Sequence, residues 1–210
     1  MYKVFFKNKS LVLTTSNQIY SDSSILINSN SSNYSQIIKL LKSKKYKIIF
    51  YYNPSADKLI KHFEKCFTII DAAGGLVMNK HYKYLLIYRN NKWDLPKGHL
   101  KKKELDLEGA AREVSEETGI KKLNPISILS TTYHFVKRDK LFKLKRTKWF
   151  LFSSSFKGDL KPQLEEGINR AEWKTKSEIK SIENEMYPNI KNLLNIHFDQ
   201  SQTEFGTSDL

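Results

Sequence analysis

Residues 98–120 read GHLKKKELDLEGAAREVSEETGI, and the interpretation of the whole chain begins from this stretch. The positions that define it are Gly98, Glu104, the run Arg112-Glu113-Val114, the pair Glu116-Glu117, and the final Gly119-Ile120. At ordinary residue frequencies, a chance match to such a pattern has a probability on the order of 10⁻⁹ at any one starting position. The spacing is therefore a specific signal.

The second half of this stretch has the pattern of an amphipathic helix. Asp106 can cap the start of the helix, and Gly119 is the residue type that commonly follows a helix end. Between these two residues, apolar side chains recur at helical spacing and predict one buried face. The residues of this face are Leu107, Ala110, Ala111 and Val114.

Three carboxylates fall together on a different face of the predicted helix. Glu113, Glu116 and Glu117 occupy positions i, i+3 and i+4, where like charges repel one another. The crowding is understandable if divalent cations lie among them. The cluster contains no Cys or His, and hard oxygen ligands favour Mg²⁺, with Mn²⁺ as the alternative.

The other reading of these carboxylates is a solvated acidic helix face. The spacing argues against it, because the pattern extends beyond one helix face to Gly98 and Glu104. Arg112 is expected to hold the glutamates, and Glu104 to orient Arg112 or to add a ligand.

The complete pattern is a Nudix box, and the chain resembles Nudix hydrolases. The resemblance implies a loop–helix–loop that hydrolyses a diphosphate linkage in a nucleoside diphosphate joined to another group. The metal ligands that it implies are the Gly98 carbonyl, Glu113, Glu116, Glu117 and, in the stretch Glu165-Glu166-Gly167, Glu166. The catalytic residues that it implies are Glu104, Arg112, Glu113 and Glu116. The general base varies among members of the family, and Glu113 is the candidate for it here.

The flanking sequence extends the resemblance to about residues 67–198. Residues 72–75 and 84–89 read as the first strands of the fold. Residues 93–98 resemble the W-x-L-P-K-G sequence of members that act on dinucleoside polyphosphates, diphosphoinositols and RNA 5′-pyrophosphates. The expected fold is α+β, a Nudix-type α/β/α sandwich with a mixed sheet. The expected substrate contacts are Lys97, Arg89 and His134; for His134 a structural role in a strand is the alternative.

The rest of the chain divides into three parts. Residues 1–66 predict a small α+β unit without a recognisable motif, and residues 67–198 the Nudix domain. Residues 199–210 are polar and are predicted to be a disordered tail.

Composition limits the compartment and the partners. No apolar run approaches the roughly 20 residues of a membrane span, so no membrane partner is expected. The single Cys66 cannot form an internal disulfide, which favours the cytoplasm. The net charge of +14 suggests a polyanionic partner. A lysine-rich composition bias explains it equally well, so no nucleic acid other than an RNA 5′ end is expected.

These observations predict a Mg²⁺-dependent hydrolase that acts on a nucleotide or polyphosphate substrate through a metal-activated water. The alternative is a catalytically idle Nudix fold that senses a ligand, and a purely nucleic-acid-binding protein is a third reading. The oligomeric state, a homodimer included, is left open by the sequence. So are the general base, the number of metal ions and the role of residues 1–66.

Overall fold

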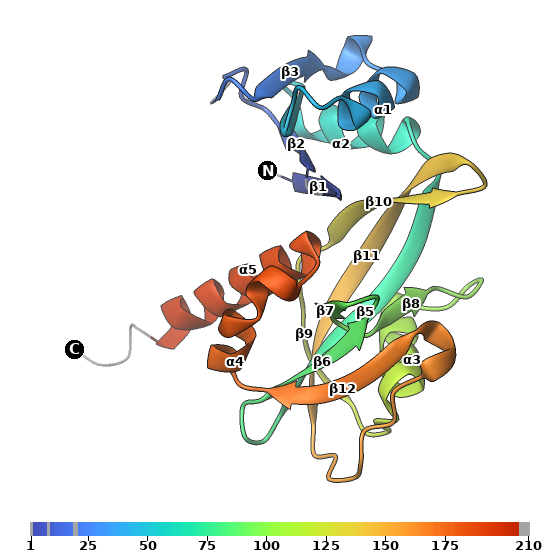
Figure 1. Cartoon of the computed structure of the whole chain (residues 1–210), viewed down its shortest axis with the longest axis vertical. Coiled ribbons are helices and arrows are strands. Elements are labelled where there is room, and N and C mark those ends of the chain that lie inside the picture. Colours follow the sequence, from blue (N-terminus) through green and yellow to red (C-terminus); the bar gives the residue numbers. More distant parts are fainter. Residues whose placement is uncertain (1, 8, 19–20, 206–210) are drawn as a thin grey trace. The chain divides into compact units, whose positions relative to one another are not determined.

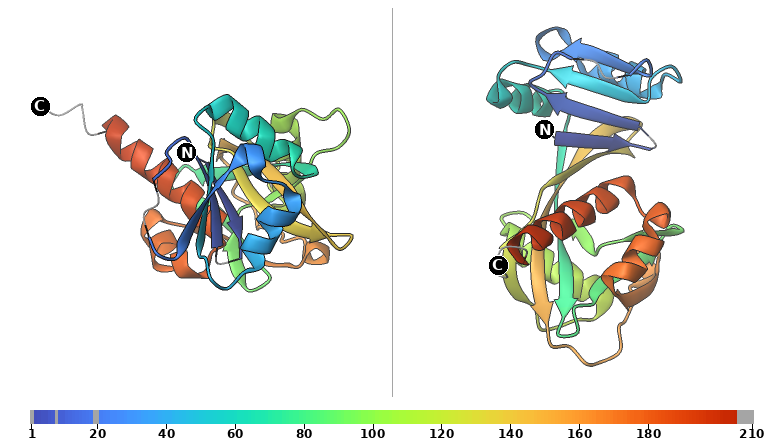
Figure 2. Two further views of the ribbon diagram at one scale, coloured as in Figure 1. Left: turned by 90° about the horizontal axis from the view of Figure 1, so that it is seen from above. Right: turned by 90° about the vertical axis from the view of Figure 1, so that its left-hand side faces the viewer.

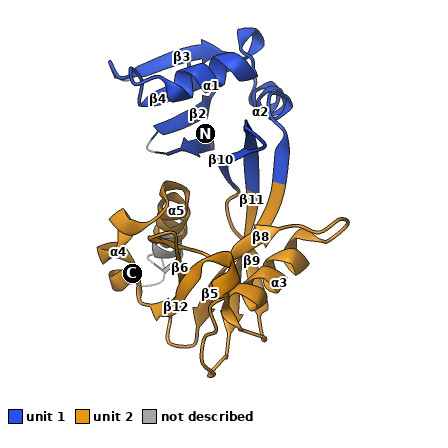
Figure 3. Ribbon diagram, turned by 45° about the vertical axis from the view of Figure 1, so that its right-hand side comes forward, with its two compact units in different colours: residues 1–70, 132–146 blue, residues 71–131, 147–210 orange. Residues whose placement is uncertain are grey.

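The computed structural model describes residues 2–7, 9–18 and 21–205, and the chain divides into two compact units. Unit 1 contains residues 1–70 and 132–146, and unit 2 contains residues 71–131 and 147–210 (Figure 3). The N-terminal segment expected at 1–66 is thus joined by a later segment of the chain. Residues 132–146 have ordinary strand character, and nothing in their sequence indicates which unit they join.

Unit 1 is built on a sheet with the strand order β10-β1-β2-β4-β3. Its strands are β1 (Tyr2–Phe6), β2 (Lys9–Thr14), β3 (Ser24–Asn28), β4 (Ile48–Tyr52) and β10 (Thr132–Arg138). The β1–β2 pair is antiparallel and forms a hairpin, whereas β1–β10, β2–β4 and β3–β4 are parallel.

Two helices and a short 3-10 helix, η1 (Ser29–Ser31), complete unit 1. Helix α1 (Tyr34–Lys42) begins at a capping box in which Asn33 and Gln36 satisfy each other's backbone N–H groups. Helix α2 (Ala56–Lys65) begins after Ser55, whose side chain accepts from a backbone N–H of the first turn. Their apolar faces join the strands in one core, which includes Val4, Leu11, Ile37, Ile49, Phe63 and Phe135.

Unit 2 contains the sheet order β12-β6-β5-β11, with β7, β8 and β9 paired to β6, β5 and β11. Its strands are β5 (Ile69–Asn79), β6 (Tyr84–Arg89), β7 (Lys92–Asp94), β8 (Lys97–His99), β9 (Asn124–Ile128), β11 (Leu141–Ser154) and β12 (Ile168–Lys174). Strands β5 and β11 each begin in unit 1 and continue into unit 2. The helices are α3 (Asp106–Thr118), α4 (Lys176–Ser181) and α5 (Pro188–Phe205), with 3-10 helices η2 (Leu164–Glu166) and η3 (Glu183–Glu185).

The two faces of the unit 2 sheet are covered by different helices. Leu76 and Leu86 belong to the core that contains residues of α4 and α5. Their chain neighbours Val77 and Leu85 belong to the core that contains residues of α3. Successive strand residues point to opposite faces, so the sheet lies between two helical layers (Figures 1 and 2). The predicted α+β fold with a mixed sheet and an α/β/α sandwich is confirmed.

Two details of the predicted helices are wrong. Leu105, not Asp106, is the N-cap of α3, and it makes no side-chain cap. Asp106 instead pairs with Lys148 of β11. Helix α5 continues to Phe205, so residues 199–205 are helical rather than a disordered tail. The remainder of that predicted tail, residues 206–210, lies outside the described residues.

Within the described residues, no helix combines the length and the apolar character that crossing a membrane requires.

Candidate active site

Helix α3 carries the box carboxylates, and its buried side differs from the predicted one. The buried residues are Gly109, Ala110, Val114, Glu117 and Thr118, whereas Leu107 is 38% exposed. Glu117 is seven positions after Ala110 and three after Val114, so helical geometry places it on the buried side. The prediction that the three carboxylates lie on a different face from the buried side chains is therefore wrong for Glu117. Glu113 and Glu116 do lie away from the buried side.

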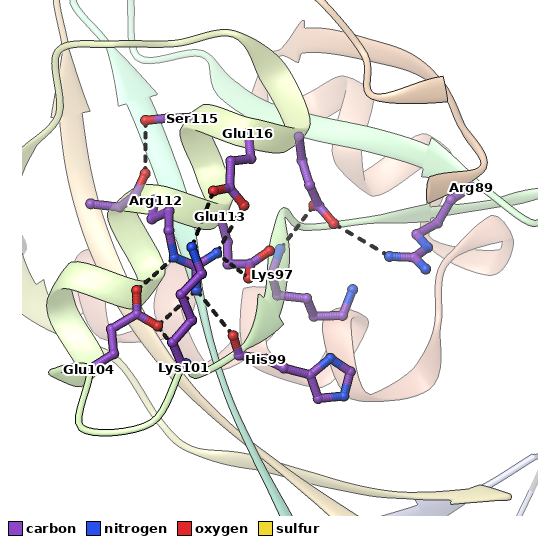
Figure 4. A network of polar contacts seen from close by, with 11 residues as sticks. Arg89, Lys97, His99, Lys101, Glu104, Arg112, Glu113, Ser115 and Glu116 are labelled. Carbon is purple, nitrogen blue, oxygen red and sulfur yellow. Dashed lines mark hydrogen bonds and ion pairs between the residues drawn. The ribbon is translucent and has the colours of Figure 1, made fainter. Parts of the chain in front are cut away.

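Arg112 organises the exposed part of the site (Figure 4). Its guanidinium donates to both carboxylate oxygens of Glu104, at 2.6 and 2.8 Å. The Nη1 atom donates to Glu113 at 2.7 Å and to Glu116 at 2.9 Å. The Nη2 atom also donates to the backbone carbonyl of His99 at 3.1 Å. The predicted role of Arg112, to hold the glutamates, agrees with these contacts.

Glu104 binds Arg112 through both of its carboxylate oxygens and so orients the guanidinium. Hydrogen bonds from Arg112, the larger cause, and from the Lys101 N–H together lower the pKa of the Glu104 carboxyl to about 2. Both carboxylate oxygens are occupied by Arg112. Of the two roles left open for Glu104, orienting Arg112 is the one that these contacts favour.

Glu113 packs against the backbone of Gly98, which lies in β8 opposite Ala73 of β5. A Cβ atom built on Gly98 would lie 1.9 Å from Glu113 Oε2. Burial raises the pKa of the Glu113 carboxyl, while the Arg112 guanidinium acts in the opposite direction. The glycine of the box therefore leaves the space into which the Glu113 carboxylate packs.

We expect the Gly98→Ala substitution to push the Glu113 carboxylate out of its position. The Glu113 carboxylate is the far end of a flexible side chain and can move aside, so the free energy of unfolding should change little. Displacing an oriented carboxylate should lower metal affinity by about 10–100-fold. Chemical unfolding and Mn²⁺ titration measure the two effects. Gly158→Ala, outside the box and without a positive φ, is the control; equal metal affinity in both variants would contradict the prediction.

Glu117 is the most deeply buried carboxylate of the box, with 1% of its surface exposed. Its Oε2 atom accepts from the Lys97 backbone N–H at 3.0 Å. Its Oε1 atom has no hydrogen-bond donor, and the nearest cation is Arg89, with Nη1 at 3.5 Å. Burial raises the pKa of Glu117 to about 7, although Lys97 and Arg89 act in the opposite direction.

The expected substrate contacts have different environments. The Lys97 ammonium is buried, binds the Asp94 carboxylate and donates to the Leu95 carbonyl at 3.2 Å. Arg89, at the end of β6, is directed to Glu117. His134 lies in β10 of unit 1, in register with Phe5. Phosphate or base contacts for Lys97, Arg89 and His134 stay predictions.

Glu166 ends the 3-10 helix η2 and is exposed. Its charge contributes to raising the pKa of Glu113, so it belongs to the same electrostatic environment. A ligand role for Glu166 stays a prediction.

Two contacts of the site were not predicted. Asp94 binds the Lys97 ammonium, and the His99 carbonyl binds Arg112. A signal for the first exists in the sequence, because Asp94 and Lys97 are opposite charges on either side of Pro96. Backbone carbonyls carry no such signal.

The donor chemistry of the cluster fits a hard divalent cation. The candidate ligands are the carboxylates of Glu113, Glu116 and Glu117, and the Glu117 Oε1 atom is buried without a donor. Mg²⁺ favours such oxygen ligands. Within residues 2–7, 9–18 and 21–205, no three acidic, His or Cys side chains form a ready-made metal cluster. Arg112 holds Glu113 and Glu116 in the arrangement described.

Comparison with known families assigns the chain to a class. The NUDIX domain model matches residues 68–194, more than half of the chain, so the chain belongs to the Nudix family. The m7GpppN-mRNA hydrolase of Saccharomyces cerevisiae (strain ATCC 204508 / S288c) is 28% identical over 149 residues, which is 69% of this chain. The mRNA-decapping enzyme subunit 2 of strain YJM789 matches equally. The chain spans 14% of the length of these relatives.

Solved structures share the fold. The MutT protein from Methanosarcina mazei Go1 has a TM-score of 0.51 and 24% identity, covering 65% of this chain and 96% of that one. An Ap4A hydrolase from C. elegans, solved as a binary complex, has a TM-score of 0.50 and 23% identity, covering 65% and 99%. At this identity, the likeness concerns the fold alone.

Proposed function

We propose that the protein is a Mg²⁺-dependent hydrolase of a diphosphate linkage in a nucleoside-diphosphate-linked substrate. The observation that carries the proposal is the position of Glu117. Its carboxylate is 1% exposed and has one oxygen without a donor, beside Glu113 and Glu116 on the same helix. The Lys97 N–H and Arg89 offset the cost of this buried charge only in part, since burial still raises the pKa of Glu117. A buried carboxylate is costly for a protein to keep, and a bound cation would lower that cost.

The residues of the proposed site have two roles, to bind the metal ion and to orient its ligands. Bound Mg²⁺ would supply Lewis acidity, orient the substrate phosphates and activate the attacking water. Glu113, Glu116 and Glu117 would hold the cation, and Arg112 fixes the first two in place. Glu104 fixes Arg112 in turn. Phosphoryl transfer depends mainly on positioning and electrostatics, which explains why so many of the contacts serve orientation.

The proposed substrates are nucleotides in which a diphosphate joins a nucleoside to a second group. Dinucleoside polyphosphates, nucleoside triphosphates and a capped RNA 5′ end all have this linkage. The likeness to the yeast m7GpppN-mRNA hydrolase adds support for the last of these. The free thiol of Cys66 fits work in a reducing compartment, and we propose the cytoplasm.

Turnover of a diphosphate panel tests the proposal. The panel contains dinucleoside polyphosphates, nucleoside triphosphates, ADP-ribose, inositol pyrophosphate and capped RNA, each incubated with Mg²⁺ and with EDTA. We expect turnover of at least one class that requires the metal and rises toward alkaline pH, where metal-bound water ionises more readily. Turnover that survives EDTA would contradict the mechanism. Metal binding without any turnover would favour the alternative of a ligand sensor.

A further inference from the structure

The positive charge of the chain is concentrated in unit 1. Residues 1–70 and 132–146 contain 17 Lys or Arg and 4 Asp or Glu, a net charge of +13. Unit 2 contains 19 basic and 18 acidic residues, a net charge of +1, although it is the larger unit. A uniform composition bias would spread the charge over both units. The division in Figure 3 is therefore also a division of charge.

Part of this charge surrounds a hollow of about 340 Å³ within unit 1. The hollow lies where the β1–β2 turn, the end of α1 and the start of β11 meet. The residues that line it are Phe6, Lys7, Lys9, Leu41, Lys42 and Phe142. Three cations thus surround an apolar floor.

Phe142, in the apolar floor of the hollow, contacts three neighbouring side chains. Phe142 meets Phe6 edge-on, with ring centroids 5.1 Å apart, and its backbone N–H donates to the Tyr34 hydroxyl at 2.9 Å. The Lys42 ammonium lies 5.4 Å from the centroid of the Phe142 ring. Phe142 itself is only half-buried. A flat apolar group could therefore meet this ring beside a cation.

The cations of the hollow are not neutralised by acidic groups. Among the described ion pairs of unit 1, Asp139 pairs with Lys143, and Glu64 pairs with Arg146. Within the part of the chain that the structure describes, no carboxylate lies within ion-pair distance of Lys7 or Lys42. Both side chains belong to exposed residues. Their charge is available to an external anion.

The chain adds more cations directly before Phe142. Residues Lys137, Arg138 and Lys140 are all exposed, and they lie in or beside the turn that joins β10 to β11. A partner that carries many regularly spaced anions would meet the hollow and this turn together, whereas a single phosphate would use only one of them.

We propose that unit 1 binds single-stranded nucleic acid, with Lys7 and Lys42 contacting phosphates and the Phe142 ring contacting a base. Positively charged grooves that combine lysines with aromatic rings bind single strands in this way, because every base has a face that can stack. Release of counterions from the phosphate backbone supplies the affinity. RNA and DNA share this chemistry. The net charge of the whole chain gives no reason to expect nucleic acid other than an RNA 5′ end. The concentration of that charge in unit 1 does.

Binding of a labelled oligonucleotide to the full chain tests the proposal. The probes are single-stranded RNA and DNA of about 20 nucleotides, measured by fluorescence anisotropy between about 50 and 200 mM salt without divalent metal. We expect binding that weakens steeply with salt, and a loss of about tenfold or more in the Lys7→Glu/Lys42→Glu variant. Lys7→Gln/Lys42→Gln, with no new acidic groups, should lose affinity in the same direction.

The matched control is Lys80→Glu/Lys157→Glu, which makes the same charge change at exposed positions of unit 2. It should bind within about twofold of the wild type. Phe142→Leu distinguishes a base contact from charge alone: it should weaken oligonucleotide binding by roughly tenfold and leave inorganic polyphosphate binding unchanged. Thermal unfolding of each variant confirms that unit 1 is folded.

Three outcomes would overturn the proposal. One is no binding of either oligonucleotide at low salt by folded protein. Another is an equal loss in the unit 1 and unit 2 charge variants, which would indicate diffuse attraction without a site. The third is loss of anionic-vesicle binding in the Lys7→Glu/Lys42→Glu variant while oligonucleotide binding is unchanged. Because the assay omits metal and measures no turnover, its failure leaves the proposed hydrolase untouched.

Discussion

Replacing Glu116 by glutamine is expected to lower Mg²⁺-dependent turnover by about 10³-fold. A bound metal supplies several kcal/mol of charge stabilisation in the transition state, and each 1.36 kcal/mol changes the rate about tenfold. Glu116 is 46% exposed, so the substitution should cost little stability. Turnover of whichever panel substrate is active, measured at saturating Mg²⁺, checks the prediction.

The control for this prediction is Glu108→Gln, which removes the same charge from the same helix. Glu108 is exposed in the first turn of α3 and is outside the box pattern. Activity within about threefold of the wild type is expected, because surface charges away from a site rarely matter. Similar losses in both variants would show that the helix needs only its overall negative charge, and would remove the argument for a specific metal site.

The architecture of the box could be predicted from sequence because its signals are local. Helix α3 lies at Asp106–Thr118 and ends at Gly119, whose φ of +78° is the left-handed conformation expected after a helix. Helix α1 lies at Tyr34–Lys42, where the sequence has the apolar spacing of a helix and a capping box at its start. Periodicity and capping residues determine such elements over a few turns, with no information from distant segments.

The environments of individual site residues could not be predicted in the same way. Helical spacing and charge place Glu117 with Glu113 and Glu116, yet in the fold its side chain is buried. Lys97, an expected substrate contact, binds Asp94 through its ammonium, and this local pair of opposite charges does have a signal in the sequence. The burial of Glu117 depends on which strand lies beside the helix, and that is a tertiary property. The same is true of residues 132–146, which join unit 1 through the parallel pairing of β10 with β1.

We expect Glu117→Gln to stabilise the metal-free protein at pH 8, by on the order of 2–3 kcal/mol relative to its effect at pH 4. Burial raises the pKa of Glu117 from an ordinary 4.5 to about 7 in the folded state. The folded state therefore holds a proton that the unfolded state releases, and the carboxylate reduces stability as pH rises from about 4.5 to 7. Below this window both states are protonated, and the substitution should have little effect.

Glu104→Gln should give the opposite dependence and serves as the matched control. Arg112 lowers the pKa of Glu104 to about 2, so its ionised form stabilises the folded state above an ordinary pKa of 4.5. That contribution is lost as pH falls toward 2, and the variant should be destabilised at pH 8. Urea unfolding in EDTA measures both curves, at several values between pH 4 and 8 for Glu117→Gln and from pH 8 down to about pH 2 for Glu104→Gln.

The effect of Mg²⁺ on the free energy of unfolding tests whether the metal binds at Glu117. If the cation binds at Glu117, it removes the cost of the buried charge, so the wild type should gain more stability from Mg²⁺ at pH 8 than Glu117→Gln does. Equal gains in the two proteins would place the metal elsewhere. A Glu117→Gln effect that is the same at pH 4 and pH 8 would show that Glu117 ionises at its ordinary pKa despite its burial. The raised pKa would then be wrong, and with it the argument that the buried carboxylate needs a cation.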